Sequence, residues 1–93
     1  MHISILTFTF SLPDCRSLKE KRQRIGSLHQ RFGRNPAVAV CESDEHDTLD
    51  RSVWSFVVAA NAKREVESIC SQIENKIQDA VDGRVIDVEK EFL

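Results

Sequence analysis

The sequence of 93 residues contains no tyrosine, one tryptophan, three glycines and two prolines. It has no glycine-rich phosphate loop, nucleophile elbow or HExxH string, which are common signatures of enzymes. It also lacks the polar bias of a disordered chain and any apolar run long enough to span a membrane. We therefore expect one soluble, non-enzymatic domain over residues 1–93, without a cofactor or a small-molecule substrate.

Cysteine and net charge are also low. The three cysteines are odd in number and form no CxxC pair, which suits a reducing cytosol, so we expect a cytoplasmic protein. The formal net charge is only −2. Bulk attraction to nucleic acid is therefore excluded, and any such binding must come from local clustering of charge.

A helix is predicted over residues 18–32. Ser17 and Glu20 have the spacing of a capping box, in which the hydroxyl and the carboxylate each satisfy a free backbone N–H. Apolar residues recur at helical spacing, and Gly33 with Pro36 supplies a stop; the apolar positions are Leu18, Ile25, Leu28 and Phe32. Lys21 lies in the same series, so its stem must follow the edge of the core and its ammonium must find water or an acid.

The predicted helix is rich in basic residues. Seven bases and a single acid, Glu20, occur between positions 16 and 34; the bases are Arg16, Lys19, Lys21, Arg22, Arg24, Arg31 and Arg34. By helical angle we expect Lys19, Arg24, Arg31 and Arg34 to project away from the core, with Lys21 and Arg22 flanking it. This cluster is the main indication of function in the sequence.

Four segments have the two-residue alternation of strands: residues 6–12, 38–41, 51–60 and 86–92. Asn61 is a plausible N-cap for a second helix that Asp82-Gly83 ends. The order β-α-β-β-α-β predicts an α+β fold, the ferredoxin-like sandwich, with an antiparallel sheet in the order 4-1-3-2 and two helices on one face.

This topology brings the acidic loop 42–50 to the end of the sheet where the first helix starts. Glu42, at the end of the second strand, is our expected partner for Lys21 in a structural ion pair. On the helix-free face we expect an apolar patch formed by Ile3, Ile5, Val53 and Val57, and such patches usually mark an interface. We therefore expect a homo-oligomer, most simply a dimer.

Three motifs resemble the YlxP-like family of bacterial proteins (domain of unknown function 503). They are Ser-Leu-Lys-Glu-Lys-Arg at 17–22 after a Phe-x-Leu-Pro strand end, Val-x-Val-x-Glu ending at Glu42, and Asp-x-x-x-Arg at 47–51. The resemblance spans nearly the whole chain. It implies a ferredoxin-like fold, small homo-oligomers and a link to ribosome maturation or translation, and it implies no enzyme activity.

RNA binding through the basic helix is the leading function, because each phosphate contact releases counterions and arginine binds phosphate bidentately. The candidate RNA-binding residues are Arg16, Lys19, Arg22, Arg24, Arg31 and Arg34. The alternative is a homo-oligomeric interaction module in which the basic helix and the acidic loop pair with each other, within or between protomers. A solvated basic face that serves only the domain's own electrostatics also remains open.

Two further kinds of site are weaker. Aromatic residues on the central strands could stack on bases, but they share parity with the helix-facing positions, which favours core packing; they are Phe8, Phe10, Trp54 and Phe56. The open sheet face should carry Asp87, Glu89 and Glu91, which repel phosphate. Asp44, His46 and Asp47 could ligate a metal, but their spacing matches no calcium or zinc pattern, so we expect none.

Overall fold

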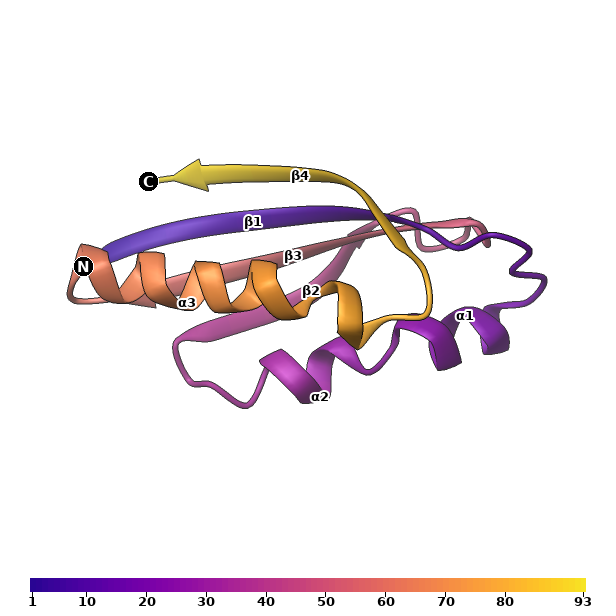
Figure 1. Ribbon diagram of the computed structural model, residues 1–93, viewed down its shortest axis with the longest axis horizontal. Coiled ribbons are helices and arrows are strands. Elements are labelled where there is room, and N and C mark those ends of the chain that lie inside the picture. Colours follow the sequence, from indigo (N-terminus) through magenta and orange to yellow (C-terminus); the bar gives the residue numbers. More distant parts are fainter.

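Four strands form one antiparallel sheet in the order β2-β3-β1-β4, and the helices cover one of its faces (Figure 1). The computed structural model describes all 93 residues. Its elements are β1 (His2–Ser11), α1 (Leu18–Ile25), α2 (Leu28–Phe32), β2 (Val38–Asp44), β3 (Arg51–Ala60), α3 (Lys63–Lys76), the 3₁₀ turn η1 (Gln78–Ala80) and β4 (Arg84–Phe92). This arrangement confirms the predicted ferredoxin-like fold. No helix combines the length and the apolar character needed to cross a membrane.

The core lies between the sheet and the helices. Alternate residues of the two central strands point into it because successive side chains of a strand face opposite sides. They are Leu6, Phe8 and Phe10 of β1 and Trp54, Phe56 and Val58 of β3, all at most 4% exposed. α3 contributes a buried stripe of Val66, Cys70 and Ile73. The prediction that the aromatic residues are core is confirmed, and the rings of Phe8, Phe10 and Phe56 are not free to stack on RNA.

The opposite sheet face carries no helix. Ile3, Ile5, Val53 and Val57 lie there, half-buried or exposed, and Ile5 pairs with Val57 across the central strands. β4 adds its acids to this face, since Asp87, Glu89 and Glu91 pair with Thr9, Thr7 and Ile5 of β1. The helix-free face therefore carries the predicted apolar residues, with the polar pair Thr7–Ser55 between Ile5–Val57 and Val53, and it is acidic along β4.

The first helical segment is broken, so the prediction of one helix over 18–32 is wrong. α1 ends at Ile25 and α2 begins at Leu28. Gly26 is a poor helix former, and serine competes with helical hydrogen bonding. At the break, Ser27 Oγ donates to the Ala80 carbonyl at 3.0 Å, and the Arg24 carbonyl accepts from the Asp82 N–H at 2.9 Å. The interruption thus joins this segment to the chain that follows α3.

Two predicted element ends also shift. Ala62, not Asn61, is the N-cap of α3, and no side chain caps that helix. β2 continues to Asp44, so Glu42 is not its last residue. The register of β2 shifts between Glu42 and Asp44, and Glu42 pairs with Trp54. Directly paired residues share a face, so Glu42 points to the helical side of the sheet.

Candidate functional site

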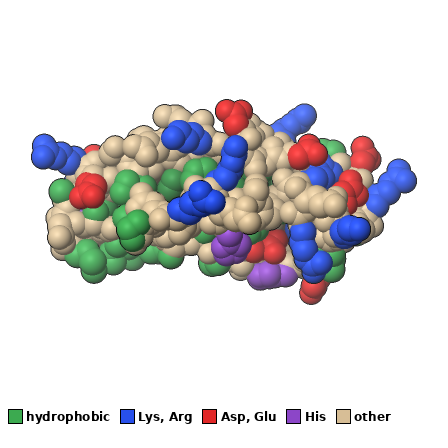
Figure 2. Space-filling view, turned by 90° about the horizontal axis from the view of Figure 1, so that it is seen from below, with side chains coloured by type: hydrophobic (Ala, Val, Ile, Leu, Met, Phe, Trp, Pro, Cys, Tyr) green, Lys and Arg blue, Asp and Glu red, His purple; other side chains and the backbone are tan.

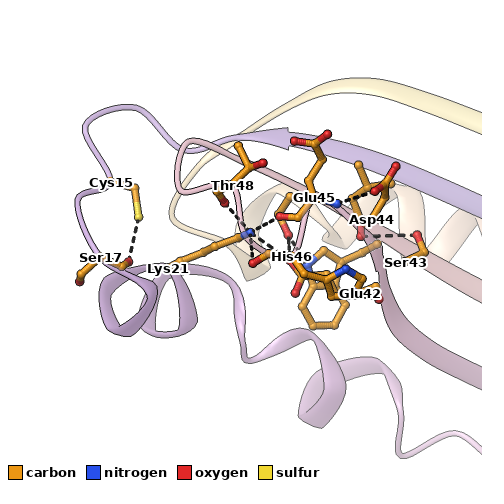
Figure 3. Close-up of polar contacts among 12 residues, drawn as sticks. Cys15, Ser17, Lys21, Glu42, Ser43, Asp44, Glu45, His46 and Thr48 are labelled. Carbon is orange, nitrogen blue, oxygen red and sulfur yellow. Dashed lines mark hydrogen bonds and ion pairs between the residues drawn. The ribbon is translucent and has the colours of Figure 1, made fainter.

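Lys21 of α1 is only 4% exposed and is the one buried charged residue of the chain. Its ammonium donates to the carbonyl oxygens of Glu45 at 2.6 Å and Thr48 at 2.7 Å, with that of His46 at 3.5 Å. Glu42 Oε2 lies 3.3 Å away, so the ion pair expected from the sequence is present (Figure 3). The buried ammonium is therefore held by a carboxylate and by the backbone of the loop between β2 and β3.

The backbone of that loop forms the binding site for Lys21. Glu45 has a left-handed φ of 61°, and its N–H donates to Asp44 Oδ1 at 2.8 Å. The Thr48 N–H donates to the Glu45 carbonyl at 3.3 Å. The resulting tight turn directs several carbonyls toward the ammonium (Figure 3). Sequence reasoning missed these carbonyl partners, because a carbonyl is common to every residue and gives no signal in the sequence.

Glu42 is held on a second side by β3. Ser52 Oγ donates to Glu42 Oε2, and Trp54 Nε1 donates to Ser52 Oγ at 2.8 Å. Ser52 is fully buried, and Trp54 is 4% exposed. This chain of contacts runs from the indole through the hydroxyl and carboxylate to the ammonium of Lys21. It orients the Trp54 ring at the end of the core.

A cavity of about 640 Å³ opens between α1 and the β2–β3 loop, beside this chain of contacts. Its apolar lining comes from Leu18, Ile25 and Trp54. Leu18, which helical spacing places with the apolar residues of this segment, is 41% exposed because it borders this opening. The polar lining includes Arg22, His29, His46 and Asp47. On this side of the molecule two histidine side chains lie near each other, with acidic side chains beside them (Figure 2).

The two imidazoles of the cavity are positioned differently. His46 Nε2 lies 2.9 Å from the Glu42 carbonyl oxygen, which fixes its ring. His29 meets Trp54 edge-to-face, with ring centroids 5.1 Å apart and planes at 70°. Sequence reasoning considered His46 only as a metal ligand and overlooked His29. The spacing of Lys21, Ile25 and His29, four residues each, could have placed His29 on the same helical side.

Five of the candidate RNA-binding bases are exposed, and none of the five takes part in an ion pair; they are Arg16, Lys19, Arg22, Arg31 and Arg34. Arg31 makes one long contact, 3.3 Å from Nη1 to the Asp79 carbonyl. The remaining charge of these side chains faces solvent. Blue side chains are spread over the helical side accordingly (Figure 2).

The prediction that Arg24 projects outward is wrong. Its side chain is 13% exposed, and its guanidinium donates to the carbonyls of Asp82 and Pro13, each at 2.8 Å. The carboxylates of Asp82 and Glu20 lie 3.6 and 3.9 Å away. The helical angle missed these partners because they come from distant segments of the chain. Arg24 therefore has a structural role and is no longer a candidate for binding RNA.

Glu20, the single acid of this segment, is also occupied. Ser17 Oγ accepts from the Glu20 N–H at 3.0 Å, which confirms Ser17 as the N-cap of α1. The Glu20 carboxylate accepts from the N–H of Arg16 at 2.9 Å, one residue before the position that a capping box requires. Its charge thus lies close to the start of α1 and to Arg24.

The residues considered as metal ligands, Asp44, His46 and Asp47, do not form a ligand group. Asp44 accepts from its neighbour's backbone, and His46 contacts a carbonyl. Nowhere does the structure bring together three or more His, Cys, Asp or Glu side chains in a way that could hold a metal ion.

Comparison with known proteins identifies the family. A search among curated proteins gives no match. The family model described as "Protein of unknown function (DUF503)" matches residues 3–90, which is nearly the whole of the sheet and all of the helices. The chain therefore belongs to the DUF503 family.

Proposed function

We propose that this chain is a non-enzymatic, cytoplasmic RNA-binding domain, associated with RNA or a ribosomal particle through the basic surface of α1 and α2. The observation that carries the proposal is the set of five exposed bases without ion-pair partners: Arg16, Lys19, Arg22, Arg31 and Arg34. Unpaired arginine and lysine side chains on a helical surface are suited to phosphate contacts.

The charge distribution supports one orientation on RNA. Glu20, the single acid between residues 16 and 34, is engaged with the helix start and with Arg24. The acids of β4 lie on the opposite, helix-free face. A polyanion would therefore approach the helical side, because the sheet face repels it. This local separation of charge compensates for a net charge of only −2.

A filter-binding experiment tests the proposal with structured and single-stranded RNA over a range of salt concentrations. The variant reverses two free bases, Lys19→Glu and Arg34→Glu, and neither native side chain forms an ion pair in the structure. We expect the affinity to fall by tenfold or more and the slope of log K against log salt to decrease by about two, since each phosphate contact contributes about one.

A matched control changes the net charge equally elsewhere. Arg64 of α3 and Arg84 of β4 are exposed and unpaired, and Arg64→Glu with Arg84→Glu should leave most of the affinity intact. An equal loss in both double variants would reject the basic surface as the binding site. The function itself would be rejected if wild-type protein bound RNA no better than about 10⁻⁴ M at physiological salt, the weak end of non-specific binding.

The alternative function is a homo-oligomeric module built on pairing between the basic helix and the acidic loop. Within the protomer, Lys21 with Glu42 is the one ion pair that joins them. Asp44, Glu45 and Asp47 carry no ion pair and remain available to a second copy. This favours pairing between protomers over pairing within one. Salt-sensitive self-association without RNA binding would support this alternative.

A further inference from the structure

The geometry points to the cavity beside Lys21 as a site for a single unpaired nucleobase bearing an exocyclic amino group, with its phosphate toward the basic surface of α1. This inference rests on the proposed function and goes beyond it, because it names a base-reading pocket within an otherwise backbone-binding surface. Three properties of the cavity carry it: its size, its planar side chains and its unpaired acceptor.

The cavity is large enough for a nucleoside. Its volume of about 640 Å³ lies within the range of ligand-binding clefts, about 300 to 1,000 Å³. Leu18, Ile25 and the Trp54 ring form the apolar part of its lining, beside polar and charged side chains. A lining of both kinds suits a flat heterocycle whose edges form hydrogen bonds and whose faces do not.

Planar groups line the same cavity. RNA-binding proteins hold unstacked bases on aromatic rings, imidazoles and guanidinium planes. Here His29, His46 and Arg22 supply two imidazoles and one guanidinium. His46 is fixed by its contact with the Glu42 carbonyl, and His29 by its edge-to-face contact with Trp54. A base would therefore meet ring positions that are already set.

The charges of the cavity select the edge of the base. The Lys21 ammonium already binds the loop carbonyls and Glu42. The Glu42 carboxylate already binds Lys21 and Ser52, so neither group is free for a ligand. Asp47 is exposed and makes neither an ion pair nor a side-chain hydrogen bond, so it is a free acceptor on the rim. A carboxylate accepts from the amino group of adenine, cytosine or guanine, whereas the single ring N–H donor of uracil lies between two carbonyl oxygens that the carboxylate repels.

The same charges argue against other small ligands. Free phosphate would meet Asp47 and Glu42 as well as Arg22, so an anion without a base has little to gain. A metal ion would have no group of three ligands here, and the nearby Lys21 ammonium would repel it. A nucleotide has both parts that the surface needs: an amino-bearing ring for the cavity and a phosphate for the outward bases Lys19 and Arg22.

The test uses the intrinsic fluorescence of Trp54. It is the single tryptophan, tyrosine is absent, and its ring lines the cavity, so all indole emission comes from a ring at this site. AMP, UMP and inorganic phosphate are titrated separately up to millimolar concentration. We expect saturable quenching by AMP, binding of UMP that is weaker by about fivefold or more, and no change in emission with phosphate.

Two variants test the assigned roles. Asp47→Asn replaces an acceptor by a side chain that can also donate, so the ratio of AMP to UMP affinity should fall at least about fivefold. Asp50→Asn is the matched control: it removes the same charge from the same loop, outside the cavity, and should leave the ratio unchanged. His29→Ala should lower the affinity for AMP about fivefold or more, because the imidazole that stacks on the base is lost.

The outcomes separate the pocket from the proposed function. RNA binding without AMP quenching, or an unchanged base preference in Asp47→Asn, overturns the pocket while the basic surface stands. Quenching by AMP with the expected change of preference supports the pocket even if RNA does not bind. Equal quenching by AMP, UMP and phosphate indicates a non-specific anion site and overturns it. The absence of any nucleotide response, combined with capture of a peptide, would assign the cavity to protein contact and also overturn it.

Discussion

Lys21 Nζ lies 3.3 Å from Glu42 Oε2, and this contact links the first helix to the strand at the sheet edge. Lys21 is 4% exposed, and the Glu42 side chain is 24% exposed. The ammonium also donates hydrogen bonds to carbonyls of the β2–β3 loop, so one side chain holds the helix, the strand and the loop together. Each of these parts borders the cavity.

Replacing Lys21 should destabilise the protein strongly. In Lys21→Ala, the Glu42 carboxylate and the loop carbonyls lose a buried partner, which we expect to cost about 3 kcal/mol of the free energy of unfolding. Urea denaturation followed by Trp54 emission measures this. Lys19→Ala is the control, since Lys19 is exposed and unpaired two positions away. Equal midpoints in the two variants would contradict a structural role for Lys21.

Arg24 should also matter for stability, although it belongs to the basic cluster. Arg24→Ala removes hydrogen bonds to the Asp82 and Pro13 carbonyls and should cost about 2 kcal/mol. Arg22→Ala, which removes an exposed arginine from the same helix, should cost at most about 0.5 kcal/mol. Thermal or urea melts compare them. If Arg22→Ala were the more damaging change, the assignment of Arg24 to the structure would be wrong.

The helix-free sheet face should mediate self-association. We expect sedimentation at micromolar concentration to give a dimer, and Val57→Lys to shift it toward monomer, because the charge would enter the apolar part of that face, where Val57 pairs with Ile5. Val88→Lys is the matched control on the other side of the sheet, where Val88 is 46% exposed. A wild-type monomer throughout the concentration range would reject this interface.

The cysteines provide a test of the fold. Cys41 is exposed, whereas Cys15 and Cys70 are buried, and all three are free thiols. At dilutions where the chain is monomeric, a thiol reagent should label one cysteine rapidly and the other two only after denaturation. Peptide mapping should identify Cys41 as the fast site. Rapid labelling of Cys70, which is 0% exposed on the buried stripe of α3, would contradict the packing described above.

Patterns with a strict period were predicted well. The strand at residues 51–60 alternates between two environments and occurs with those bounds, because every second side chain enters the core. Lys21 was identifiable as a polar residue in an apolar stripe, and the topology pointed to Glu42. Both predictions use local spacing together with one rule of strand order, and neither depends on detailed backbone geometry.

Features that depend on distant backbone atoms were not predictable in this way. One glycine is tolerated within a helix, so Gly26 did not reveal that the chain breaks there to bond with residues 80–82. Arg24 looked solvent-facing because its partners are carbonyls from other segments. The cavity was missed for the same reason, since its lining joins α1, α2, β2, β3 and a turn whose shape depends on the φ of one residue.

The place of β4 determines the order in which the sheet can be completed. β4 lies beside β1, so strands from opposite ends of the chain are neighbours, and the Leu93 N–H donates to the Ile3 carbonyl at 2.9 Å. Until residues 84–92 are available, β1 has an unpaired edge beside Phe8 and Phe10. Such an edge is a template for pairing with other chains. During synthesis the nascent domain is thus open on one side of its central strand until residues 84–92 leave the ribosome.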